Sequence, residues 1–480
     1  SDVMFVAHGA CGSSPQSDIN CTSIRVTKEM PYMGRISQRC MVPLLNALVL
    51  ANSLCQDSED AALITVYNKS MNLRQTNLAT SWQSPRDLAI VPPPTEVHAG
   101  AEVFTIYSAV PSFGEDGNFI ALLLRKPIKG PSIFCSGSGR AHISQVRIFE
   151  HAMLCDWPEE EKKHELFEVF LEDAHGKHLA KVIANRKFGL LKKYQTVACV
   201  RDIFAPNRPN SLQAGQKAFG PALKMLVQWM EYNWLHGIDH FFIYTFNGTE
   251  SAIKDVMEPY LKSGVATRIH FDHFQDDKVI RQKQVANDCL YRAKSHAKWA
   301  LPSLDIDEYF RITSKQVFPG GGTVPQMYMR TCWDALVKHY GKKPEEVPAF
   351  VFWKFRFARR TDDSLHILST WREPHLQFVN PNLVGGPPQF HGQKLAMHVP
   401  YVFDAHYHHL VVPSESSALA LNESIGVMNH YRDDFDHKHG EDDRNANVFD
   451  DAMLTEAPML EKALSARFGH PLHDLWDQLR

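Results

Sequence analysis

Apolar residues recur at helical and strand periods through the second half of the chain. Residues 223–236 space their apolar positions as an amphipathic helix, and Gly237 provides its end. The apolar run from His240 to Phe246 then indicates a buried strand. The same alternation continues with helices over 252–262 and 279–297 and with strands over 265–271 and 299–304. Strands that alternate with helices predict an α/β fold with a mostly parallel sheet, whose ligand site lies at the carboxyl ends of the strands.

The last of these strands runs directly into two aspartates, Asp305 and Asp307, which are separated by Ile306. Alternate side chains of an extended segment share a face, so we expect both carboxylates to grip one divalent ion while Ile306 points into the core. Such oxygen ligands favour Mg²⁺ or Mn²⁺. Because an Asp-x-Asp also arises by chance and in solvated turns, its flanks decide its meaning.

The pattern is different before residue 190. Short runs rich in β-branched and aromatic residues occur at 62–67, 102–107, 119–124 and 166–171, separated by Pro, Gly and Ser. Such runs predict a β-rich, sandwich-like part. A chain of 480 residues usually makes two or three domains. We therefore predict a β-rich module over 1–190 and an α/β domain over 191–480.

Charge and cysteine usage restrict the class of protein. The net charge is −3, so the sequence predicts no broad basic surface for nucleic acid. No apolar stretch of 18 residues occurs. Nine cysteines allow up to four disulfides, which favours a lumenal or secreted protein. Four of them crowd the amino end, at Cys11, Cys21, Cys40 and Cys55, and glycosylation sequons begin at Asn20, Asn68, Asn247 and Asn422.

Several segments, in their order and spacing, resemble glycosyltransferase family 92. They are Trp229-Met-Glu-Tyr, Gly237 to Tyr244, Gln284 to Arg292, Leu304 to Phe310, Gly392-Gln-Lys394 with His406, and the closing motif Asn429-His-Tyr-Arg432. The resemblance covers residues 195 to 435 and implies a GT-A-like nucleotide-sugar-binding domain that uses Mn²⁺ with UDP-galactose and inverts the anomeric centre. It also suggests that the β-rich module ahead of that domain binds carbohydrate; a structural domain that only packs against the transferase domain is the alternative. A further implication is a Golgi-lumen enzyme held by a membrane anchor, which we expect to precede this sequence.

The resemblance assigns roles to the charged residues. Asp307 and His430 would hold the metal ion, and Asp305 would be a further ligand or would bind the ribose or a metal-bound water. Lys394 would be a second cation for the diphosphate, and Arg292 or Arg432 a third. Two alternatives stay open: His430 pairs with the acidic run that follows it, and Lys394 is a solvated surface lysine.

Three further candidates lie on the helix predicted over 279–297. Gln284, Asp288 and Arg292 are spaced by four and so share one helix face, where they are predicted to contact the nucleotide or sugar. A helix-stabilising pair between Asp288 and Arg292 explains the spacing equally well. Asn247, after the first strand, is either a turn residue or a nucleotide contact.

Inverting transfer also needs a carboxylate that removes the proton of the acceptor hydroxyl. The candidates follow the strand-like run 349–355 and are Asp362, Asp363 and Glu373, with Glu373 preferred because it lies close to Trp371.

These observations predict a metal-dependent inverting transferase that moves galactose from UDP-galactose to a galactan or glycan acceptor through a β-1,4 linkage. A homodimer is left open. One alternative is a glycan-binding protein with an inactive transferase domain. Another is an Asp-x-Asp phosphohydrolase, although Tyr309 stands where that motif has Thr or Val. A metallohydrolase built on the histidines of 391–409 lacks the glutamate base of the helical zinc motif.

Overall fold

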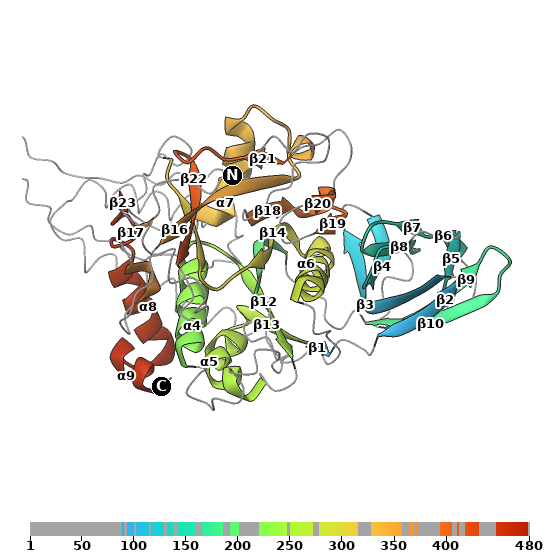
Figure 1. Cartoon of the computed structure of the whole chain (residues 1–480), viewed down its shortest axis with the longest axis horizontal. Helices are drawn as coiled ribbons and strands as arrows, with labels where there is room; N and C mark the ends of the chain where they lie inside the picture. The colour runs from blue at the N-terminus through green and yellow to red at the C-terminus, as the bar shows by residue number, and fades with distance from the viewer. Residues whose placement is uncertain are drawn as a thin grey trace, which may run out of the picture. The chain divides into compact units, whose positions relative to one another are not determined.

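The computed structural model (Figure 1) describes much of the chain from residue 89 onward. The described stretches are 89–90, 94–99, 102–114, 117–128, 132–137, 143–158, 166–185, 193–200, 220–246, 250–271, 278–314, 328–357, 365–368, 371–372, 394–405, 410–411, 418–431 and 448–478. All of them belong to one compact unit, Gln83–Arg480. The strand predicted over 62–67 and the four amino-terminal cysteines lie outside these residues.

Two antiparallel sheets occupy the region predicted to be β-rich. The first has the order β2 (Thr95–Ala99), β3 (Glu102–Gly114), β4 (Gly117–Leu124), β8 (Ala152–Asp156) and β7 (Arg147–Ile148). The second has the order β10 (His178–Asn185), β9 (Leu166–Asp173), β5 (Ile133–Ser136) and β6 (Ile143–Gln145). The strands predicted over 102–107, 119–124 and 166–171 are thus confirmed within β3, β4 and β9.

Strand β4 of the five-stranded sheet is buried on both faces, which explains its continuous apolar run. Ile120 and Leu122 pack into a core shared by the two antiparallel sheets. Phe119 and Ala121 point the other way, into a second core that includes Leu290 of the predicted α/β domain. Because successive strand residues face opposite sides, a strand covered on both faces needs no polar alternation.

A larger, mixed sheet carries the predicted α/β pattern. Its main order is β1 (Ala89–Ile90), β13 (Ala266–Phe271), β12 (His240–Phe246), β11 (Tyr194–Val200), β14 (Ala297–Leu304), β18 (Lys394–His398), β16 (Ala349–Phe357), β17 (Trp371–Arg372) and β23 (Val448–Phe449). Strands β15 (Glu308–Ile312), β22 (Gly426–Tyr431) and β21 (Leu419–Ala420) pair off this path. Pairing is parallel from β1 to β14 and antiparallel from β14 through β18 and β16 to β17 and β23. The parallel order predicted from the sequence therefore holds for one half of the sheet.

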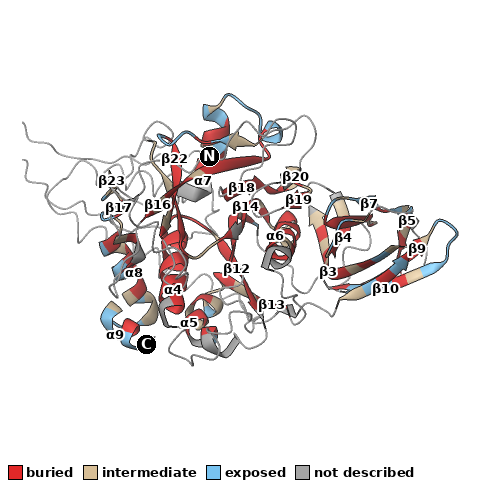
Figure 2. Ribbon diagram, viewed as in Figure 1, coloured by how far each residue is buried: buried red, intermediate tan, exposed pale blue. Residues whose placement is uncertain are grey.

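The predicted helices are present with small shifts at their ends. They are α4 (Gly220–Leu235), α5 (Glu250–Lys262) and α6 (Lys278–Lys294), and α7 (Tyr328–His339), α8 (Ala457–Phe468) and α9 (Leu472–Gln478) follow. Gly237, just after α4, has φ of 100°, a value that suits glycine at a helix end. Figure 2 shows α4 as buried, and this holds from residue 222 to residue 235. Among the described helices, none is long and apolar enough to span a membrane.

Candidate active site

Asp305 and Asp307 lie in the turn that joins β14 to β15. The backbone N–H of Glu308 donates to the carbonyl of Asp305 at 3.1 Å, which closes the turn. The prediction of an extended segment is therefore wrong, and Ile306 is half-buried instead of pointing into the core. The chain turns because β15 pairs with β22, whereas β14 lies between β11 and β18.

The turn brings Asp307 to His430, which is 123 residues away in sequence. Asp307 Oδ2 lies 2.9 Å from His430 Nε2. Strand pairing fixes this approach, because Glu308 is opposite His430 and the N–H of Tyr431 donates to the carbonyl of Asp307 at 2.8 Å. Within the described residues, Asp307 Oδ1 and His430 Nδ1 are buried and have no hydrogen-bond partner. The acidic run that was the alternative partner of His430 lies outside the described residues.

The donor atoms of this pair fit a hard divalent ion. Two ligands at right angles about an ion, each at about 2.1 Å, are separated by roughly 3 Å. Buried polar atoms without a partner are costly, so a further interaction is expected at Asp307 and His430. In the described part of the chain, no group of three or more His, Cys, Asp or Glu side chains could hold an ion by itself. A small protein ligand set is typical of Mg²⁺ sites that substrate phosphates and waters complete.

Asp305 belongs to a neighbouring cluster of charges. Lys394 Nζ lies 3.0 Å from Asp305 Oδ2 and 2.9 Å from Glu308 Oε2. Lys354 Nζ lies 3.6 Å from the other oxygen of Glu308. The Lys394 side chain is only 3% exposed, so the alternative of a solvated surface lysine is wrong. Its contact with a diphosphate and the metal ligation by Asp305 stay predictions.

Glu308 and Lys354 were not among the residues predicted for the site. Glu308 is 1% exposed, and its carboxylate also accepts the backbone N–H of Asp305 at 3.1 Å. Burial lowers the pKa of Lys354, and the nearby Glu308 carboxylate opposes this change. The sequence signal that could have revealed the cluster is Lys354 inside the apolar run 349–355, because a buried charge needs a partner.

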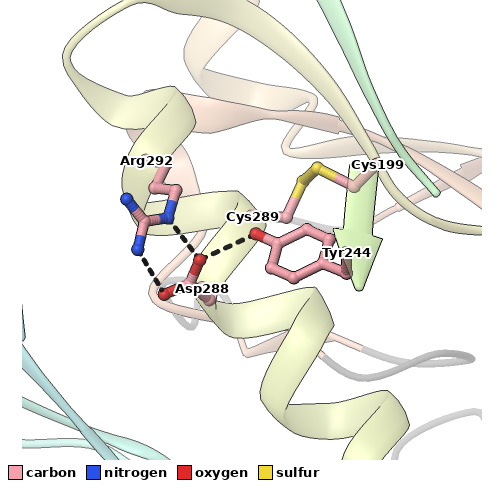
Figure 3. The surroundings of a disulfide bond; sticks show 5 residues. All are labelled: Cys199, Tyr244, Asp288, Cys289 and Arg292. Atoms are coloured by element: carbon pink, nitrogen blue, oxygen red, sulfur yellow. Dashed lines mark hydrogen bonds and ion pairs between the residues drawn. A yellow bond between two sulfur atoms is a disulfide. The ribbon is translucent and has the colours of Figure 1, made fainter. Parts of the chain in front are cut away.

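The predicted ligand face of α6 is occupied by contacts within the protein (Figure 3). Asp288 is fully buried and accepts a hydrogen bond from the hydroxyl of Tyr244 at 2.7 Å. The hydroxyl of Ser108 also donates to Asp288 at 2.7 Å. Arg292 contacts both oxygens of Asp288 from the next turn of α6. Burial and the Asp288 carboxylate raise the pKa of Tyr244, so its hydroxyl keeps the proton that it donates. The structure therefore contains the helix-stabilising pair that was the alternative.

Gln284 lies one turn earlier on the same helix. Its backbone carbonyl accepts the hydroxyl of Tyr107 at 3.0 Å, and its side chain is buried. Ligand contacts of Gln284, Asp288 and Arg292 are not tested by this geometry and stay predictions. The same holds for Asn247, Arg432 and the base candidates Asp362, Asp363 and Glu373, which lie outside the described residues.

Comparison with known proteins identifies the family. The family model for glycosyltransferase family 92 matches residues 216–459, which include the aspartate turn, both lysines and His430. The chain belongs to glycosyltransferase family 92. A galactan beta-1,4-galactosyltransferase of Arabidopsis thaliana is similar to this family 92 chain, with 28% identity over 109 residues. That match spans 22% of this chain and 22% of the plant protein. The resemblance predicted from the sequence is therefore confirmed.

Proposed function

We propose that this chain is a metal-dependent, inverting transferase that moves galactose from UDP-galactose to a galactan or glycan acceptor, with a β-1,4 linkage. The observation that carries the proposal is the facing pair Asp307 and His430, which retains buried polar atoms without a partner in the described residues. The plant relative is a galactan beta-1,4-galactosyltransferase, which supports the choice of galactose and linkage.

The strand order supports a GT-A-like domain. In the parallel part, β12 and β13 extend to one side of β11 while β14 lies on its other side. Ligands of open α/β sheets bind at such a change of direction, outside the carboxyl ends of the strands. Val200 and Leu304, which end β11 and β14, are partners in register. The turn with Asp305 and Asp307 follows Leu304 directly and so lies at this position.

The proposed chemistry divides the work among few side chains. Asp307 and His430 would hold Mn²⁺ or Mg²⁺, which supplies positive charge for the diphosphate leaving group when bound. Asp305 would contact the donor, held in place by Lys394. Glu373 or Asp363 would take the proton of the acceptor hydroxyl on the face opposite the diphosphate, as inversion requires.

The cellular setting is part of the proposal. We place the protein in the Golgi lumen, membrane-anchored as a type II protein and glycosylated, with an oligosaccharide or polysaccharide as its acceptor and no nucleic-acid partner. The disulfide between Cys199 and Cys289 supports an oxidising compartment. The antiparallel sheets ahead of the family match would bind carbohydrate as a sandwich-like module.

The test is donor-dependent transfer followed by mass spectrometry. The protein is incubated with Mn²⁺, a panel of UDP- and GDP-sugars, and β-1,4-galactooligosaccharides of defined length. We expect a mass gain of one hexose from UDP-galactose, lost on chelation and in Asp307→Asn and His430→Gln. A matched control is His473→Gln, which breaks an exposed His–Asp pair on α9. Transfer that survives chelation and both site substitutions would refute the metal site, and a different donor would refute the galactose assignment.

A further inference from the structure

We infer that Glu308 is a positioning residue for the donor site and that it acts through Lys394 on Asp305. This inference rests on the proposed function, because it assigns the side chains that fix the nucleotide-sugar contact of Asp305. The residue lies outside the Asp-x-Asp itself, and its carboxylate is almost completely buried.

The backbone of Glu308 is held rigidly. It is the first residue of β15, is paired with β22, and its carbonyl accepts the indole N–H of Trp229 at 2.8 Å. Trp229 is fully buried in α4, so Glu308 is fixed to the interior of the protein. A carboxylate on such a backbone is a fixed reference point for the turn beside it.

The two lysines reach Glu308 from neighbouring strands. Lys394 opens β18 and is the register partner of Phe352 in β16. Lys354 lies two residues after Phe352, so both lysines are on the same face of the sheet. Each oxygen of Glu308 therefore has its own ammonium group, Oε2 with Lys394 and Oε1 with Lys354.

Lys394 transmits this arrangement to Asp305. Its ammonium lies between the two carboxylates at 2.9 and 3.0 Å, distances typical of charge-assisted hydrogen bonds. Glu308 also accepts the N–H of Asp305, so it orients the backbone and, through Lys394, the side chain of the same residue. Asp305 is the most exposed member of the cluster, with 28% of its side chain accessible. The buried charges thus fix the one carboxylate that faces outward.

A purely structural role for Glu308 can be distinguished from a positioning role by comparing stability with donor binding. The cluster contains two carboxylates and two lysines and is balanced in charge. Glu308→Gln leaves one buried positive charge in excess, which destabilises a protein whatever the function of the site. Adding Lys354→Met restores the balance while leaving Lys394 and Asp305 in place. Stability and donor binding should therefore respond differently to the second substitution.

The experiment measures binding of UDP with Mn²⁺ by calorimetry, binding of Mn²⁺ alone by electron paramagnetic resonance, and thermal unfolding. For Glu308→Gln we expect the Kd for UDP to rise by about ten-fold or more, because a charge-assisted contact to the bridging lysine is lost. The Kd for Mn²⁺ alone should stay within about two-fold, because the oxygen and nitrogen ligands of Asp307 and His430 are retained and the Glu308 carboxylate pairs with the two lysines instead. In Glu308→Gln with Lys354→Met, unfolding should return toward the wild-type temperature while the UDP affinity stays low.

Glu231→Gln is the matched control, since it removes another buried carboxylate, which pairs with Arg467 outside the site. It should lower stability and leave UDP binding unchanged. Full recovery of UDP affinity in the double variant would overturn the inference, because Glu308 would then only balance the charge of Lys354. Unchanged UDP affinity in Glu308→Gln would overturn it as well. If the wild-type protein binds neither UDP nor GDP with Mn²⁺, the proposed function fails first and the inference falls with it.

Discussion

The disulfide between Cys199 and Cys289 gives a quantitative prediction. It joins the end of β11 to α6 and closes a loop with a sequence separation of 90 residues (Figure 3). Closing a loop of this length in the unfolded chain costs about 4.5 kcal/mol of entropy at 25 °C. Breaking the crosslink should therefore lower the free energy of unfolding by about that amount. The stabilisation arises in the unfolded state and does not require any contact of the sulfur atoms.

The assay compares two sets of variants in urea. Cys199→Ala with Cys289→Ala removes the crosslink, and Cys332→Ala truncates a cysteine that is equally buried but free. Unfolding is followed by tryptophan fluorescence, and the midpoints are compared with and without dithiothreitol. The pair variant should unfold at distinctly lower urea than Cys332→Ala. Dithiothreitol should lower the midpoint of the wild-type protein and leave that of the pair variant unchanged.

The decisive comparison is between the pair variant and the control. Equal midpoints for the pair variant and Cys332→Ala would refute the loop-closure reasoning. Truncating buried sulfur atoms would then account for the whole effect. An effect of dithiothreitol on the pair variant would show that another disulfide also contributes to the stability.

Three other changes should affect stability in specific ways. Burial lowers the pKa of His398 to about 4, so the unfolded chain binds a proton at a higher pH than the folded chain does. The free energy of unfolding should therefore be highest above pH 6.5 and about 2 kcal/mol lower at pH 5. In urea titrations at the two pH values, His398→Gln should reduce this difference, and an unchanged difference would assign it to other groups. Arg467→Met leaves the buried Glu231 without its salt bridge and should cost about 3–5 kcal/mol, whereas the double variant Arg467→Met with Glu231→Gln should recover part of the loss. Asn287→Leu removes the side chain that accepts the N–H of Ala405 at 2.9 Å and donates to its C=O at 2.7 Å. Hydrogen exchange at the Ala405 amide should become faster, and an unchanged exchange rate would contradict this expectation.

The elements of the α/β part were predictable because their signal is local. The helix α4 and the strand β12 carry their periods within about seven to sixteen residues of sequence. Gly237 marks the helix end through its own backbone preference. The apolar positions of these short segments also indicate which faces are buried. Neither long-range pairing nor a partner domain is therefore needed to recognise these elements.

The site was only partly predictable because its partners are distant in sequence. Asp305 and Asp307 were identified from their position after a strand, but the turn that separates them depends on pairing between β15 and β22. The role of Lys394 as a buried bridge depends on the register of β16 and β18. For Asp288 the spacing to Arg292 was visible, yet the hydroxyl of Ser108 comes from 180 residues away. Periodicity in one segment contains no information about such register.

The antiparallel sheets are connected to the candidate site through α6. Strand β3 packs on α6, and Ser108 bonds Asp288 within the core that both regions share. From α6, Cys289 is linked to Cys199 in β11, and the next residue, Val200, is the register partner of Leu304. Covalent bonds and contacts thus connect the β-rich region to the residue that precedes Asp305. If the proposed function is right, a substitution on the β3 face of α6 should weaken the affinity for UDP measured by calorimetry. A substitution that only disturbs the proposed carbohydrate binding on the sheets should leave the affinity for UDP unchanged.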